Sequence, residues 1–159
     1  MKFHNKIFLV YFLSLLGIIL WIVLIFLAPY LKSVSSPWHI FLYTLFAPIC
    51  HQAPERSFFL CGYPLAVCAR CLGIYSGFLA GTGVYPFLKG FSSLTMPKTI
   101  NFLLLSLPIG IDTLGNFFHI WNTTNTARFF IGFLWGTILP FYFIYGLSDL
   151  WLNLPGKKD

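Results

Sequence analysis

Charged residues are scarce in this sequence, and acidic residues are the scarcest. Only 9% of the 159 residues are charged, and aspartate and glutamate together number four. The chain also lacks a dense basic stripe, a glycine-rich phosphate loop, a carboxylate pair suited to hydrolysis and a recognisable Ser-His-Asp arrangement. These absences argue against nucleic-acid binding and against the enzyme classes that such motifs mark.

Hydrophobic residues, by contrast, make up 58% of the chain, and aromatic residues make up 20%. An ordinary soluble domain contains fewer apolar residues and interrupts them more often. The sequence therefore predicts an integral membrane protein, with residues 1–159 forming one domain of a few spanning helices. The lipid bilayer is its predicted partner, and most aromatic side chains are expected at the lipid face and in the interfacial belts.

Long apolar runs predict an all-α membrane protein with about four transmembrane helices. The predicted spans cover residues 7–28, 72–88, 99–120 and 128–152. Segment 38–49 is apolar but only about 12 residues long, so it is predicted to form a short interfacial or re-entrant helix. We expect Pro29 to end the first span and Pro140 to kink the last one.

Glycines recur at intervals of four residues in two of the predicted spans. Gly73, Gly77 and Gly81 lie in the second span, and Gly132 and Gly136 lie in the fourth. Glycines at this spacing form a flat stripe on which another helix can pack closely. We therefore expect these positions to serve helix packing rather than chemistry.

The lysines predict how the chain is oriented in the membrane. If segment 38–49 does not span, one side receives the lysines near both termini and in the turn before the third span, namely Lys2, Lys6, Lys89, Lys98, Lys157 and Lys158. The positive-inside rule makes that side cytoplasmic, so both termini are predicted to be cytoplasmic and the loop 50–71 extracytoplasmic. If segment 38–49 spans, the turn and the C-terminus move outside, which satisfies the rule less well.

The loop 50–71 contains all four cysteines and the only glutamate of the chain. Cys68 and Cys71 form a C-x-x-C motif at a helix start, where their sulfurs share one face and are close enough to form a disulfide or to bind one metal ion. The helix N-terminus and Arg70 would favour the thiolate form. The loop also begins with a thiol beside an imidazole, and such ligands favour zinc or copper. The predicted metal ligands are therefore Cys50, His51, Cys68 and Cys71.

Disulfide formation is the alternative state of these cysteines. In an oxidising compartment an even number of cysteines suggests two bridges, which could serve only to staple a short loop. The remaining cysteine, Cys61, lies in the middle of the loop beside Gly62. The redox candidates are accordingly Cys50, Cys61, Cys68 and Cys71.

A second set of polar residues is predicted at the same membrane surface. Asp112, Asn116 and His119 are spaced so that they share one face in the outer half of the third span. Arg128 opens the fourth span on that side, and two more arginines lie in the facing loop. An ionisable residue inside a span usually has a partner, so Asp112 is expected to pair with an arginine, in a functional site or in a structural salt bridge. The predicted cofactor-binding residues are Arg56, Arg70, Asp112, Asn116, His119 and Arg128.

Two stretches of the sequence resemble a known family. C-H-Q-A-P-E-R-S-F at 50–58 and G-Y-P-L-A-V-C-A-R-C-L-G-I-Y-S-G at 62–77 are similar to an uncharacterised prokaryotic integral membrane family, domain of unknown function 2085. The Gly-x-Asp that ends at Asp112 and the Asn-x-x-Arg at 125–128 resemble its second half. The resemblance extends to Gly136 and implies no established activity. It implies functional positions at Cys50, His51, Gln52, Arg56, Ser57, Cys68, Arg70, Gly73, Tyr75, Asp112 and Arg128.

Two chemical functions are open from the sequence. The first is a site for a transition metal or another cofactor, in which the arginines and Asp112 orient ligands and tune charge. The second is quinone-linked thiol–disulfide exchange, since four spans with a C-x-x-C at the outer surface resemble DsbB and vitamin K epoxide reductase in outline. Cys68 and Cys71 would then exchange electrons with the quinone, while Cys50 and Cys61 would relay them to a membrane or extracytoplasmic protein partner.

Two roles without catalysis are also open. Three arginines on one side of the membrane are typical of a site for an anionic ligand such as a lipid headgroup. A purely structural role, with the cysteines as staples, is the other alternative. Whether the protein is an enzyme is therefore not decided by the sequence.

Overall fold

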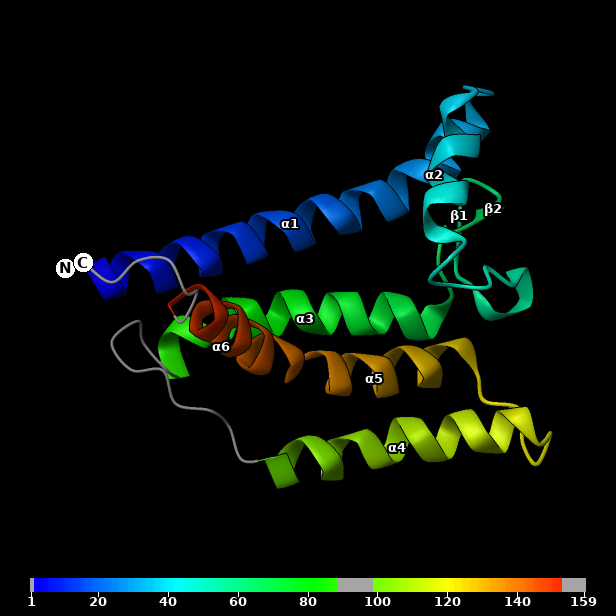
Figure 1. Ribbon diagram of the computed structural model, residues 1–159. Helices are drawn as coiled ribbons and strands as arrows, with labels where there is room; N and C mark the ends of the chain where they lie inside the picture. Colours follow the sequence, from blue (N-terminus) through cyan, green and yellow to red (C-terminus); the bar gives the residue numbers. More distant parts are fainter. Residues whose placement is uncertain (1, 89–98, 153–159) are drawn as a thin grey trace.

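The computed structural model describes residues 2–88 and 99–152, whose arrangement is shown in Figure 1. The predicted all-α membrane architecture is confirmed. The predicted turn at 89–98 and the C-terminal lysines Lys157 and Lys158 lie outside the described residues. In chain order the elements are α1 Lys2–Ser33, α2 Trp38–Phe46, the 3-10 helix η1 Pro54–Arg56, β1 Phe59–Leu60, β2 Tyr63–Pro64, α3 Ala69–Leu88, α4 Thr99–Phe117, α5 Asn125–Gly136 and α6 Leu139–Leu152.

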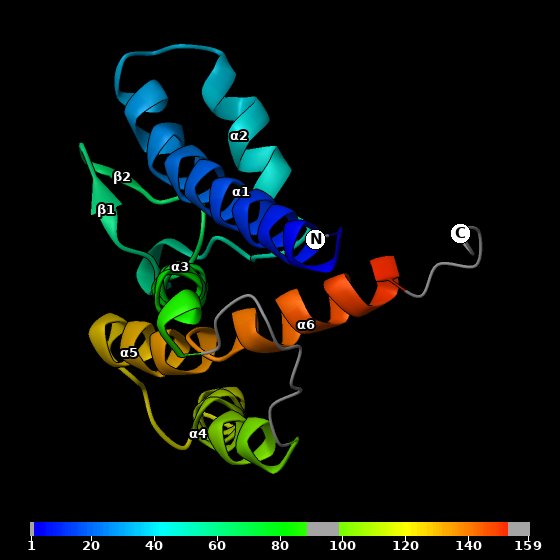
Figure 2. The same ribbon diagram turned by 90° about the vertical axis from the view of Figure 1, so that its left-hand side faces the viewer.

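The long helices run alongside one another in a bundle (Figure 1). Seen from the end of the bundle in Figure 2, α3 lies between α1 and α5, and α4 packs on the far side of α5. α1 begins and α6 ends at one end of the bundle, whereas α2, the two strands and the first turns of α3 and α5 gather at the opposite end. The loop 50–68 therefore lies at one end of the bundle, beside the starts of two helices.

Three of the described segments are long and apolar enough to cross a membrane, namely Ile7–Ser33, Ala69–Leu88 and Asn125–Leu150. Phe102–Phe117, within α4, is a shorter apolar helix. α2 has 9 residues and reaches only about 14 Å at 1.5 Å per residue. The number of spans, the orientation of the termini and the side of the membrane on which the loop lies remain predictions.

The expectation that Pro29 ends the first helix is wrong. α1 continues through Pro29 to Ser33, and Pro29 is fully buried. A proline removes one backbone donor and crowds one carbonyl, and a membrane helix packed against its neighbours tolerates both. The helix ends instead where Ser35 adopts a left-handed φ of 55° and the N–H of Ser36 bonds to the carbonyl of Leu31 at 2.9 Å.

The last predicted helix, over 128–152, is two helices in the structure. α5 ends at Gly136 and α6 begins at Leu139, so Pro140 lies in the first turn of α6. Pro140 has no N–H to donate to the carbonyl of Gly136, and proline is favoured in the first turn of a new helix. The kink expected at Pro140 is therefore a break between two shorter helices.

Other helix ends also differ from the predicted ranges: α1 begins at Lys2 rather than at residue 7, and α5 begins at Asn125 rather than at residue 128. α2 ends at Phe46 rather than at residue 49, and α4 ends at Phe117 rather than at residue 120. α3 begins at Ala69 rather than at residue 72, so Arg70 and Cys71 belong to its first turn. These shifts of a few residues decide which side chains belong to the site.

A short hairpin, which the sequence analysis did not predict, lies in the loop before α3. β1 and β2 pair antiparallel, with Phe59 opposite Pro64. Cys61 and Gly62 form the two-residue turn, with φ of 52° and 81°. Positive φ at both turn positions suits the right-handed twist of a hairpin.

The glycine stripes pack α3 directly against α5. A Cβ atom on Gly77 would lie 2.2 Å from the carbonyl oxygen of Phe133, and one on Gly136 would lie 2.2 Å from that of Ile74. The other three glycines of the stripes meet the backbone of the facing helix in the same way: Gly73, Gly81 and Gly132. This close approach agrees with the packing role predicted for them, and it holds the first turn of α3 beside the first turn of α5.

Candidate functional site

The loop that carries the site rests on a small apolar core at the end of α1 and α2. The buried members of this core include Ile25, Ala28, Leu42, Phe46, Leu65, Ala66 and Val67. The side-chain amide of Gln52 ties the loop to α2 by donating to the carbonyl of Tyr43 at 2.7 Å, and it joins two parts of the loop by donating to that of Ala66 at 2.9 Å. The Tyr43 hydroxyl in turn donates to the carbonyl of Pro64 at 2.5 Å. These bonds hold the backbone beside the cysteines in place.

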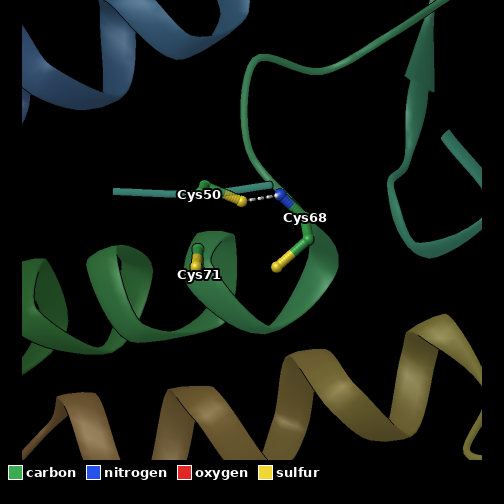
Figure 3. A group of neighbouring side chains, drawn as sticks. All are labelled: Cys50, Cys68 and Cys71. Carbon is green, nitrogen blue, oxygen red and sulfur yellow. Dashed lines mark hydrogen bonds between the residues drawn. The ribbon is translucent and has the colours of Figure 1, made fainter. Parts of the chain in front are cut away.

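Three of the four predicted metal ligands come together in the structure. Cys50 follows α2, whereas Cys68 directly precedes α3 and Cys71 lies in its first turn. Their sulfur atoms all lie within 4.8 Å of one another, and Figure 3 shows the three side chains converging. The backbone N–H of Cys68 also donates to the sulfur of Cys50 at 3.1 Å. All three residues are free thiols, and a group of this kind can hold a metal ion.

The pKa of the Cys50 thiol is lowered from its ordinary value. The largest cause is hydrogen bonding from the Cys68 thiol to the Cys50 sulfur, followed by hydrogen bonding from the Cys71 thiol. The backbone N–H groups of Cys68 and Gln52 contribute in the same direction, whereas burial opposes the shift. Because the thiolate is the form that binds metals and attacks disulfides, Cys50 is well prepared for either chemistry.

The other two residues that the sequence associated with this group lie apart from it. His51 is exposed and lines a cavity that the three cysteines also line. Its ring nitrogens, however, are not among the ligand atoms that gather within 4.8 Å. Cys61 is exposed in the hairpin turn, and its sulfur does not belong to the group either.

A cavity of about 390 Å³ borders the three sulfurs. Besides the cysteines and His51, its walls carry all three arginines of the chain: Arg56, Arg70 and Arg128. Among the residues that the structure describes, no acidic side chain lines this cavity. We call it the thiol–arginine pocket. Its walls combine soft metal ligands with positive charge.

Asp112 does not line this pocket, but it pairs with Arg70, which does. Its carboxylate accepts a hydrogen bond from the Arg70 guanidinium, and only 6% of its side chain is exposed. The other carboxylate oxygen accepts from the Thr123 hydroxyl and, at 3.0 Å, from the amide of Asn116. The predicted pairing of Asp112 with an arginine is present, and the partner is the arginine between the two cysteines of the C-x-x-C motif.

Arg128 is held by neutral groups from two helices. Its guanidinium donates to the side-chain oxygen of Asn116 at 2.9 Å and to that of Asn125 at 3.1 Å. The side-chain amide of Asn125 donates to the carbonyls of Glu55 and Ser57, both at 3.3 Å. Arg128 is thereby fixed between α4, α5 and the loop, and it is 8% exposed.

The expectation that His119 shares a face with Asp112 and Asn116 is wrong. α4 ends at Phe117, and His119 follows in a turn with a positive φ of 55°. Its side chain is exposed, so only two of the three residues contribute to the polar network. The helix ends because the backbone turns to bring Thr123 back to Asn116, whose side-chain oxygen accepts from the Thr123 N–H at 3.3 Å.

Two residues of this network were not among the predicted site residues. Thr123 binds Asp112, and Asn125 connects Arg128 to the loop. Asn125 stands in a motif that resembles the known family, which is the signal that could have identified it. Thr123 lies in an ordinary polar connection, and only the fold brings it to Asp112.

The fold and the site define an all-α membrane protein with a thiol-lined and arginine-lined pocket at one end of its helix bundle. The chain belongs to the membrane-protein family described as domain of unknown function 2085, which matches residues 50–142. This range contains every cysteine and every arginine of the sequence. The resemblance stated from the motifs is therefore confirmed.

Archaeal proteins without an assigned function are similar to this chain. An uncharacterized protein of Methanocaldococcus jannaschii is 36% identical over 140 residues, which cover 84% of this chain and 90% of that protein. An uncharacterized protein of Methanothermobacter thermautotrophicus is 36% identical over 87 residues, which cover 55% of this chain and 77% of that protein. No solved structure matches the chain significantly.

Proposed function

We propose that Cys50, Cys68 and Cys71 bind one soft transition-metal ion, zinc or copper, at the end of the helix bundle. The observation that carries this proposal is the gathering of three sulfurs within 4.8 Å from two separate segments. Thiolate ligands select zinc and copper over magnesium and calcium, which prefer oxygen. The lowered pKa of Cys50 favours the loss of its own proton, whereas the Cys68 and Cys71 thiols that donate to it keep theirs until the ion displaces them.

Three protein ligands would leave a coordination position open on a tetrahedral ion. Zinc sites that are purely structural are closed by protein ligands, whereas zinc sites that act on a ligand keep one position free. His51 lines the same cavity and is one way to fill that position if its ring turns inward. A water molecule or an exogenous ligand in the pocket is the other. The arginines would then tune the charge of the ion and of whatever binds it.

A second candidate is quinone-linked thiol–disulfide exchange, which a separate apolar groove favours. This groove of about 650 Å³ lies between α1, α3 and α6, and Ile74 and Tyr75 line it in the helical turn after Cys71. Cys68 and Cys71 would close a disulfide and pass two electrons and two protons to the quinone, which becomes the quinol. The relay from Cys50 to Cys61 loses support, since Cys61 lies apart from the other thiols.

Elemental analysis and thiol counting on the same anaerobic detergent preparation test the metal proposal. Wild-type protein, grown with added zinc and separately with added copper, should carry about one ion per chain. Cys50→Ser and Cys68→Ser should lose it, whereas Cys61→Ser, the matched control in the exposed turn, should keep it. Metal-free wild-type protein, or equal loss in the Cys61 variant, would contradict the proposal. Metal-free protein whose thiols are oxidised by a soluble quinone would favour the second candidate.

A further inference from the structure

We propose that the thiol–arginine pocket also binds a phosphate group beside the cysteines. This inference rests on the proposed function in one respect, namely that the metal ion and the anion share the pocket. The ligand is a phosphate-type oxyanion, either inorganic phosphate or the headgroup of a phosphatidic acid lipid. The contacts of the three arginines, taken one at a time, support this assignment.

The charges around the pocket are not balanced by the protein. Arg56, Arg70 and Arg128 line the cavity, while Asp112 is the acidic side chain bonded to one of them. Among the described residues that ion pair is the only one found. The pocket therefore has three guanidinium groups, and one of them is paired with a carboxylate. A divalent metal ion held by three thiolates would add a single negative charge and would leave the surroundings positive.

Arg128 is the most deeply buried of the three cations. It is 8% exposed, and the side-chain atoms that accept its hydrogen bonds are neutral amide oxygens, those of Asn116 and Asn125. A buried charge normally requires an opposite charge close by, because neutral dipoles only partly replace water. Asp112 reaches Arg128 only through the side chain of Asn116, and its carboxylate is already bonded to Arg70. An anion in the cavity that Arg128 lines would supply a charge in direct contact.

Arg70 has a hydrogen-bond donor left over. One terminal nitrogen of its guanidinium binds Asp112, but the Nε–H is buried and has no partner among the described residues. Buried donors are nearly always satisfied by protein, water or a ligand. Arg70 also stands in the first turn of α3, whose free backbone N–H groups add positive potential at the pocket.

The chemistry of the walls selects the class of anion. Guanidinium groups present parallel N–H donors that match the oxygens of phosphate better than a single point charge does. A phosphate monoester carries between one and two negative charges near neutral pH, which suits the surplus of cations. Arg56 is exposed, so it places a further charge at the mouth of the pocket where an incoming headgroup would arrive.

Binding of labelled inorganic phosphate to the full-length protein in phosphatidylcholine nanodiscs tests this inference. We expect saturable binding by wild type and about tenfold weaker binding by Arg56→Gln, as for the loss of one charge-assisted contact. The matched control is Lys32→Gln, because Lys32 lies at the same end of the bundle but outside the pocket. Arg56 is exposed, so its replacement should leave the fold intact. The control should bind phosphate like wild type.

The two sources of phosphate are separated by nanodiscs that contain phosphatidic acid. If this lipid competes with labelled phosphate, or is retained by wild type and lost from Arg56→Gln, the headgroup is a ligand of the pocket. Unchanged phosphate binding in its presence identifies free phosphate as the ligand. No binding of either, or equal binding by wild type and Arg56→Gln, would overturn the inference.

Metal content measured on the same samples separates this inference from the proposed function. Full metal occupancy without phosphate binding would overturn the anion site alone. Phosphate binding that depends on Arg56 in a protein without metal would overturn the metal site alone. Cys50→Ser provides a further check, since it should remove the metal ion and leave the three arginines in place.

Discussion

The middle of α3 and the side chains of its first turn lie in opposite surroundings, although the backbone of α5 contacts both regions. In the middle there is no room for a single added carbon, since a Cβ atom on Gly77 would lie 2.2 Å from a carbonyl oxygen of α5. At the first turn, Arg70 and Cys71 border a cavity of about 390 Å³. The difference indicates that a rigid backbone contact positions the polar residues, so that the pocket can stay open without collapsing.

The two regions should therefore respond to substitution in opposite ways. The glycines let the backbones of α3 and α5 touch, so any added side-chain atom forces the two helices apart. The pocket contributes charge and sulfur, and its side chains can be exchanged for others of similar size with limited harm to the fold.

Replacing Gly77 with alanine should destabilise the protein by about 3 kcal/mol or more, because the backbone of α5 cannot yield as a flexible side chain would. The matched control is Gly83→Ala on the same helix, where an added Cβ meets nothing within 4 Å. Alanine there should be neutral or stabilising by about 0.5 kcal/mol. Thermal unfolding in detergent measures both. Equal stability of the two variants would contradict the view that the glycine contact between α3 and α5 positions the site.

Replacing Asp112 with asparagine should have a smaller effect, about 2 kcal/mol. Loss of one partner from a fully buried ion pair costs more, but the Arg70 side chain is 21% exposed and water can partly replace the carboxylate. α4 should loosen from α3, to which the ion pair joins it, while α3 and α5 stay packed through their glycines. Denaturant unfolding, together with proteolysis of α4, measures this outcome.

The control for Asp112→Asn is Thr113→Val, an exposed neighbour whose hydroxyl bonds only to its own helix at 2.6 Å. It should change stability by less than about 0.5 kcal/mol. A variant at Asp112 as stable as this control would show that the ion pair does not hold α4. Metal content should survive in both variants, because Asp112 does not touch the sulfurs.

The positions of the helices could be predicted from the sequence because the patterns that indicate them extend over many residues. Apolar runs and glycines at intervals of four residues extend over whole helices, and errors at single residues do not erase them. The ends of the helices could not be predicted as well. Pro29 stays inside α1 because tertiary packing overrides the tendency of proline to end a helix. Pro140 follows that tendency, since the helix breaks before it and a new helix begins.

The candidate site was predictable to the extent that motifs and spacing determine it. The C-x-x-C motif placed Cys68 and Cys71 together, and the topology brought Asp112 near an arginine. His119 was misplaced because α4 ends two residues before it. Which arginine pairs with Asp112 depends on contacts between segments far apart in the chain. The same is true of His51, a predicted ligand whose ring nitrogens lie outside the group of sulfurs.

X-ray absorption at the metal edge of the purified protein tests directly whether the three cysteines bind the ion. For a zinc-loaded wild-type sample we expect about three sulfur neighbours at roughly 2.3 Å and one lighter neighbour, and we expect no such sulfur shell from Cys50→Ser, which should lose the ion. The wild-type spectrum should be found for Cys61→Ser. A coordination shell made mainly of oxygen or nitrogen, or one that does not change in Cys50→Ser, would contradict the account.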